Sequence, residues 1–204
     1  MINVGILLSG AVLFLNGLML KGKAEAKSVA ILNFFVGILQ IVIPFYLIMI
    51  SDQSNWTIYG LAATFLFGLT FLYVSFTFYK GIDGSGLGWF SAWVSMIAIF
   101  YALVSIVHFQ DYVTALTWLM WAFLWYLFYA LNILKKPIEE FVGKVALVQS
   151  FVTLTFPALL SFIGVWEELV IQRIWLVVLS ASILYFIKGA VNLRALQQKQ
   201  AVSL

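Results

Sequence analysis

The sequence predicts an all-α integral membrane protein, a single domain over residues 1–204 with seven transmembrane helices. Two observations support this. Of the 204 residues, 64% are apolar and only 9% are charged, whereas a soluble domain carries about 25% charged residues. The charged residues also divide the chain into apolar runs. Each run approaches the 20 or so residues with which a helix crosses a hydrocarbon core of about 30 Å. Lipid is therefore the expected solvent for much of the surface.

The first three expected helices are delimited by charged or polar residues at their ends. They end at Lys21, before the polar run 51–55, and at Lys80. The first is expected to stay in the mature chain, since residues 1–4 lack the basic segment of a cleaved signal peptide. The three helices cover residues 2–20, 28–50 and 56–79.

The remaining four helices follow the same rule. Asp111 follows the fourth, Lys135 ends the fifth, and Glu167 follows the sixth. Arg173 and Lys188 lie near the two ends of the seventh, where long basic side chains extend to the membrane interfaces. The four helices cover residues 88–108, 112–134, 142–163 and 172–191.

The basic residues predict the orientation, because cytoplasmic loops collect Lys and Arg. Arg173 alone falls on one side of the expected bundle. We therefore expect a multi-pass protein of the cytoplasmic membrane with its N-terminus outside and its C-terminus in the cytoplasm. The same asymmetry supports the seventh helix, without which the basic tail would lie outside. The ten basic residues of the other side are Lys21, Lys23, Lys27, Lys80, Lys135, Lys136, Lys144, Lys188, Arg194 and Lys199.

The composition also argues against several kinds of function. The chain has no cysteine and a single histidine, His108, so we expect no metal site, cofactor or thiol nucleophile. No cluster resembles a catalytic site, and the net charge of +3 gives no indication of nucleic-acid binding. We therefore do not expect the protein to be an enzyme. All the loops are short, so the function must lie within the membrane.

The interior of the expected helices carries no charged residue. Charged groups inside a membrane usually mark ion paths or proton relays, so their absence favours a passive path for a small neutral solute. Neutral polar residues at depth either line such a path or join neighbouring helices. Gln149 and Thr153, four residues apart, share one helix face. The full set is Asn16, Asn33, Gln40, Thr70, Asn132, Gln149 and Thr153.

Three tryptophans in the fifth helix are spaced three and four residues apart, so they lie on one face. Trp121 and Trp125 fall near the helix centre, whereas Trp56, Trp89 and Trp175 near helix ends are typical of membrane interfaces. Trp118, Trp121 and Trp125 form either a packing face or the wall of a flat slot. A planar solute such as urea or a small amide would hydrogen-bond to the indole N–H groups there, and the apolar throat would exclude ions.

Several segments together resemble the AmiS/UreI family of urea channels and amide transporters. The resemblance covers the first six expected helices, and residues 88–91 with the seventh helix resemble the amide-transporter branch. The matching segments are Asn16-Gly17, Asn33-Phe34-Phe35-Val36-Gly37, Leu66-Phe67-Gly68-Leu69-Thr70-Phe71-Leu72-Tyr73, Gly88-Trp89-Phe90-Ser91, Trp118-Leu119-Met120-Trp121-Ala122-Phe123-Leu124-Trp125, Asn132-Ile133-Leu134-Lys135 and Pro157-Ala158.

The resemblance implies a homohexamer in which each protomer holds its own pore with two constrictions. We add Asn16 to the implied pore residues because its polar side chain lies at depth. The candidate path is Ile6, Ser9, Leu13, Asn16, Phe67, Phe71, Trp118, Trp121, Leu124, Trp125, Gln149 and Thr153.

The chain departs from the urea-channel pattern at several of these positions. Gln149 replaces a pore-facing glutamate, Phe71 a tyrosine, Thr114 a tryptophan and Ser9 an aliphatic residue. These departures put a strict preference for urea in doubt. The outer loops are short and His108 stands alone, so acid gating is not expected.

We therefore predict a passive channel for urea or short-chain amides, with the small neutral solute and membrane lipid as its partners. A seven-helix receptor or retinal protein is an alternative, but Lys188 lies too near the helix end for a Schiff base. A proton-coupled transporter is a further alternative. It is disfavoured because no charged residue and no histidine lies in the middle of an expected helix.

Overall fold

The computed structural model is helical along nearly its whole length and describes the backbone of residues 1–202 and the side chains of residues 1–195. The side chain of Lys199, which the charge count includes, lies outside this described part. The elements are α1 (Ile2–Leu20), α2 (Ala26–Ile50), α3 (Asn55–Lys80), α4 (Ser85–Val107), α5 (Tyr112–Asn132), α6 (Glu139–Gln149), the π-helix η1 (Ser150–Thr155), α7 (Phe156–Phe162) and α8 (Leu169–Val202).

The fold class predicted from the sequence is confirmed. Over the described residues, seven spans are long and apolar enough to cross a membrane, with α6, η1 and α7 counting together as one span, Glu139–Phe162. The last helix is longer than expected and reaches Val202 instead of residue 191. The added segment is rich in Leu, Ala and Gln, which favour helix.

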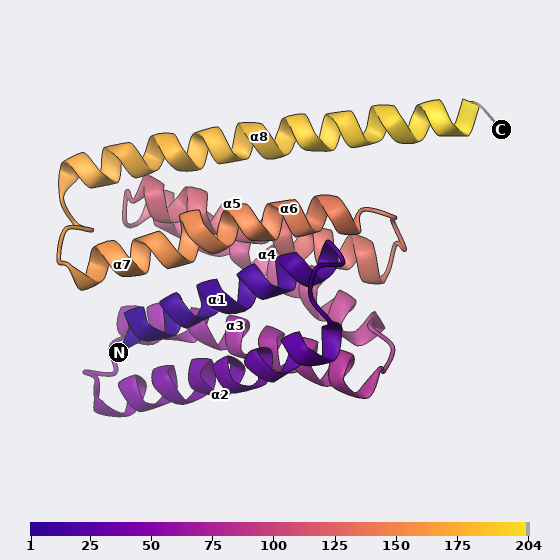
Figure 1. The fold of residues 1–204 in the computed structure, drawn as a ribbon. Helices are drawn as coiled ribbons and strands as arrows, with labels where there is room; N and C mark the ends of the chain where they lie inside the picture. The colour runs from indigo at the N-terminus through magenta and orange to yellow at the C-terminus, as the bar shows by residue number, and fades with distance from the viewer. Residues whose placement is uncertain (203–204) are drawn as a thin grey trace.

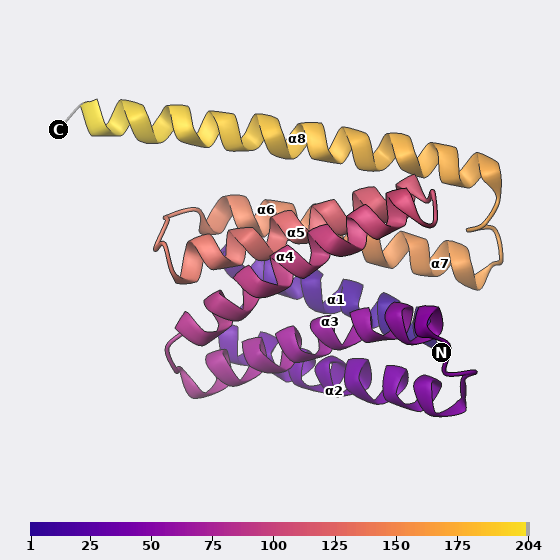
Figure 2. The ribbon, with the colours of Figure 1, turned by 180° about the vertical axis from the view of Figure 1, so that it is seen from behind.

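The helices run back and forth along one long axis, and α8 lies on the outside of the bundle (Figure 1, and from behind in Figure 2). The N-terminus shares one end of the bundle with the loops 51–54, 108–111 and 163–168. The loops 21–25, 81–84 and 133–138 lie at the opposite end with most of the basic residues. Which end faces the cytoplasm stays a prediction from the charges.

Two glycines let α1 cross α6 at close range. A Cβ atom on Gly17 would lie 3.0 Å from the carbonyl oxygen of Gly143, and one on Gly143 would lie 2.9 Å from the carbonyl oxygen of Gly17. Small residues permit such close backbone contact inside membranes. The crossing fixes α1 against α6, which continues directly into η1 and Thr153.

Gly17→Ala is therefore expected to lower the stability of the folded protein. The added methyl group would overpack the crossing at a cost of about 1–3 kcal/mol, which a lower thermal unfolding midpoint in detergent would report. The control is Gly60→Ala, because a Cβ at Gly60 meets nothing within 4 Å and alanine favours helix. Equal midpoints for Gly17→Ala and wild type would refute the role of the crossing.

Polar side chains tie α1 to α2. Asn16 and Asn33 form a reciprocal amide pair, with N···O distances of 3.2 and 2.7 Å. Nearer the N-terminal end, Gln40 Nε2 donates to the Gly5 carbonyl at 3.0 Å and to the Ser9 hydroxyl. Asn33 therefore joins helices, one of the two interpretations that the sequence left open.

Candidate functional site

Three cavities follow one another through the bundle between α1, α3, α5 and the α6–η1–α7 helix. The outer cavity, at the end that holds the N-terminus, has a volume of about 550 Å³. The central cavity measures about 40 Å³ and the inner cavity about 190 Å³. Neighbouring cavities share wall residues, so a solute that crossed the protein would meet two narrow points.

The outer constriction consists of the residues shared by the outer and central cavities: Phe67, Trp121 and Leu154. The inner constriction consists of those shared by the central and inner cavities: Asn16, Val74 and Phe128.

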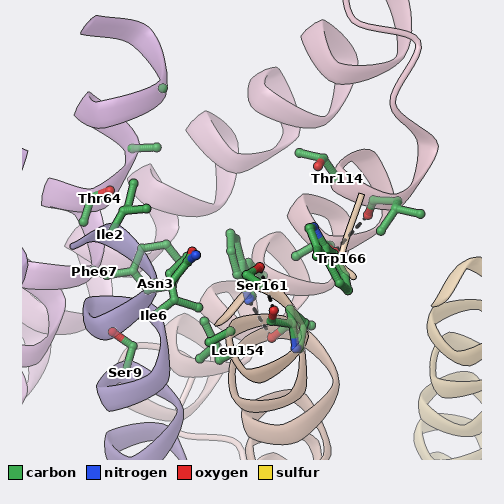
Figure 3. Close-up of a pocket in the computed structure, with 18 of the residues that line it drawn as sticks. Ile2, Asn3, Ile6, Ser9, Thr64, Phe67, Thr114, Leu154, Ser161 and Trp166 are labelled. Carbon is green, nitrogen blue, oxygen red and sulfur yellow. Dashed lines mark hydrogen bonds between the residues drawn. The ribbon is translucent and has the colours of Figure 1, made fainter. Parts of the chain in front are cut away.

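The outer cavity is wide and its mouth is partly polar. Figure 3 shows Ile6 of α1, Phe67 of α3 and Leu154 of η1 around it. Asn3 and Ser161 add polar side chains nearer the mouth. Among the described side chains that line this cavity, Glu167 is the charged one. Its position in the loop 163–168 leaves the deeper wall neutral.

Two threonines anchor the central tryptophans. Trp121 Nε1–H donates to Thr153 Oγ1 at 3.0 Å, and Trp125 Nε1–H donates to Thr70 Oγ1 at 3.3 Å. Each threonine hydroxyl donates in turn to the carbonyl four residues earlier, at 2.7 Å for Thr153 and 2.6 Å for Thr70. A buried indole N–H needs such a partner. The two N–H groups are therefore occupied, and the expectation that they bind the solute does not hold for them in this structure.

Aromatic contacts also hold the rings of Trp121 and Trp125 in place. The Phe67 ring lies 4.7 Å from Trp121, edge to face, and 5.0 Å from Trp125. Trp118 stacks on Tyr101 with a centroid distance of 4.5 Å and lines the outer cavity. Such pairs add stability beyond their buried area. The path is thus bounded by ring surfaces that both packing and hydrogen bonds hold in place.

The central cavity is apolar despite its two polar residues. The amide of Asn16 is paired with Asn33, and the hydroxyl of Thr70 lies between Trp125 and the Leu66 carbonyl. The volume of about 40 Å³ has room for only about three water molecules. A solute that enters must leave most of its hydration shell, which is far more costly for an ion than for a neutral molecule.

All the candidate path residues except Gln149 lie on these cavities. Gln149 lines none of the cavities described here. Its Nε2 donates to the Met120 carbonyl at 2.8 Å, and its buried Oε1 has no hydrogen-bond partner among the described residues. The outer cavity takes Ile6, Ser9, Phe67, Trp118, Trp121 and Thr153, and the central cavity takes Leu13, Asn16, Phe71, Leu124 and Trp125, with Phe67 and Trp121 shared.

The candidate path named from the sequence omits three residues of the constrictions. Val74 follows Phe67 by seven residues and Phe128 follows Trp121 by seven, so helical spacing from the named aromatics leads to both. Leu154 gives no such signal, because it lies in the π-helix η1. His108 stacks on Trp56 at 4.0 Å and lines none of the cavities described here.

Comparisons with known proteins agree with this architecture. The profile of AmiS/UreI family transporters matches residues 1–165. The chain belongs to the AmiS/UreI family. AmiS2 of Rhodococcus erythropolis, described as a candidate transporter protein, is 38% identical over 163 residues, or 79% of each chain. A candidate transporter of amidate substrates from Mycolicibacterium smegmatis is 38% identical over 166 residues, 81% of this chain and 78% of that protein.

The acid-activated urea channel of Helicobacter pylori is also an AmiS/UreI relative. It is 30% identical, with 81% of this chain and all of the relative covered. Its crystal structure matches with a TM-score of 0.74 at 32% identity, over 81% of this chain and 99% of the channel. The family match ends at residue 165, four residues before α8 begins. Helix α8 therefore lies outside the matched part.

Proposed function

We propose that this AmiS/UreI protein is a passive channel for urea and short-chain amides in the cytoplasmic membrane. The observation that supports it is the series of three cavities with a neutral, apolar centre. The named relatives are channels or transporters, for urea and for amidate substrates. Transport, not catalysis, is the proposed activity, and each of the candidate path residues on the cavities is assigned to this path. Gln149 supports α5 at Met120 from behind the path wall.

The small central cavity accounts for the chemical class of the solute. An ion would lose its hydration there without a compensating charge. A planar amide or urea loses hydrogen bonds but no charge, and its small, flat shape suits a narrow path whose wall includes the rings of Phe67 and Trp121. Hydration is restored at the polar mouths, where Asn3 and Asn132 line the outer and inner cavities.

Uptake of labelled urea and acetamide into proteoliposomes tests the proposal. Both solutes should enter faster than into protein-free vesicles and should stop at equal concentrations inside and outside. Uptake at the protein-free rate would refute the channel. Accumulation against a gradient when a proton gradient is imposed would instead favour a proton-coupled transporter.

We also propose that the channel is not gated by acid, so that acetamide flux stays constant between pH 5.5 and 8. Among the described side chains, none that lines the central cavity is titratable. Histidine is the side chain that usually titrates in this range, and His108 lies outside the cavities. In the loops, hydrogen bonds from the Ser54 backbone and the Ser85 side chain lower the pKa values of Asp52 and Asp83. Both carboxylates therefore stay ionised across the range. A flux that rose steeply below pH 6 would contradict this prediction.

The bundle presents a broad apolar exterior on α2 and α4, with Phe35, Phe45, Trp89 and Phe100 more than half exposed. Lipid or neighbouring subunits must cover such a surface. In line with the family resemblance we propose a homohexamer with one path in each protomer and the N-terminus outside. The mass of the purified complex in detergent tests the assembly.

A further inference from the structure

The π-helix leaves one backbone carbonyl without its expected partner. Within η1 the hydrogen bonds run to the fifth preceding residue, as from the Phe156 N–H to the Phe151 carbonyl. The next bond of this pattern would run from residue 157 to the Val152 carbonyl. Residue 157 is proline and has no N–H. In a membrane such a freed carbonyl must find another donor.

Helix α8 supplies that donor. Trp175 Nε1–H donates to the Val152 carbonyl at 2.8 Å. The indole is half-buried, and its ring contacts Trp166 edge to face at 5.6 Å and Phe156 at 6.4 Å. The bond joins α8, which lies outside the family match, to the irregular turn that borders the path.

Three consecutive residues connect this bond to the outer constriction. The Val152 carbonyl is held by Trp175, Thr153 accepts the indole N–H of Trp121, and the Leu154 side chain lines the constriction itself. A shift of the turn at Val152 therefore moves both the anchor of Trp121 and the facing wall.

We propose that Trp175 is a positioning residue of the outer constriction, through which α8 sets the largest amide that passes. This inference rests on the proposed channel function. It assigns to the seventh span a role in solute size selection. Trp175 does not touch the solute and acts through Val152 and Thr153.

The test compares the permeability of butyramide with that of acetamide in proteoliposomes that contain Trp175→Phe. Phenylalanine keeps the ring contacts and removes the donor. Loss of one hydrogen bond of ordinary strength should raise the butyramide-to-acetamide ratio about threefold to tenfold. The matched control is Trp93→Phe, on the exposed outer side of α4, which should leave the ratio unchanged.

The same substitution in a Pro157→Ala protein distinguishes a positioning role of Trp175 from a general loosening of the contact between α8 and η1. Pro157→Ala restores an N–H that can bond to the Val152 carbonyl, so Trp175→Phe should change the ratio much less in that background. An unchanged ratio for Trp175→Phe alone, or an equal change in both backgrounds, would overturn the inference while leaving the channel intact.

Hydrogen exchange gives a readout that does not depend on flux. Amides of residues 150–156 should exchange faster in Trp175→Phe than in wild type and Trp93→Phe. Unchanged protection there would overturn the inference. If the wild-type protein itself does not conduct, the proposed function fails, and this exchange measurement still decides whether Trp175 holds the turn.

Discussion

Replacing Val74 by tryptophan is expected to reduce urea and acetamide uptake to that of protein-free vesicles. Val74 is 4% exposed, and its side chain lines both the central and the inner cavity. An indole at this position fills the narrow central space. Initial uptake rates in proteoliposomes measure the effect.

The matched control is Thr64→Trp, on the same helix α3 but in the outer cavity of about 550 Å³. There the indole leaves space beside it, and uptake should stay close to that of wild type. Overpacking at Val74 costs about 1–3 kcal/mol, so both variants must first be shown to elute like the wild type and to unfold in one cooperative transition above the assay temperature. A folded Val74→Trp protein that conducts normally would place the path elsewhere.

Trp121→Ala is expected to abolish size discrimination at the outer constriction. The substitution removes one of the three side chains that the outer and central cavities share, and the Thr153 hydroxyl loses the indole N–H that it accepts. The permeability of butyramide relative to urea should rise about tenfold, a change of about 1.4 kcal/mol in relative barrier height.

Trp93→Ala, on the exposed outer side of α4, is the control for the loss of a tryptophan. It should leave the permeability ratio as in wild type. If Trp121→Ala gives the wild-type ratio in a folded protein, the tryptophan face of α5 serves only for packing.

The fold was accessible from the sequence because hydropathy and charge act on whole segments. Lys21, Lys80 and Lys135 each stand close to the end of an apolar run, and the corresponding loops lie at one end of the bundle. A local change in the backbone hydrogen-bond pattern within an apolar run alters neither its hydropathy nor its charge. The sequence predicted an ordinary α-helix over residues 150–155, and Pro157 gave no indication that a π-helix precedes it.

Residues of the site could be predicted from the sequence where their side chains differ chemically from the aliphatic side chains that normally face lipid. Tryptophans at depth and Asn16 stood out, and the structure places them on the cavities. Val74 and Leu154 are aliphatic residues in aliphatic surroundings, and only the packing of the other helices turns them toward the path. Gln149 stood out as polar but bonds to the Met120 backbone instead.

Trp175 illustrates the limit of positional rules. Its place near a helix end predicted a side chain at the membrane interface. The structure gives it a partner on another helix, the Val152 carbonyl, whose need for a donor depends on Pro157. Such a requirement becomes visible only when the backbone bonds of both helices are known.

The central claim is that the three cavities form one path for the solute. The chain has no cysteine, so a single cysteine at Leu124, which lines the central cavity and is 6% exposed, can be modified without background. A small neutral thiol reagent should reach it from water, dissolved acetamide should slow the reaction, and the modified protein should no longer take up acetamide. A cysteine that stays unreactive in the folded protein, or that reacts while uptake continues unchanged, would contradict the account.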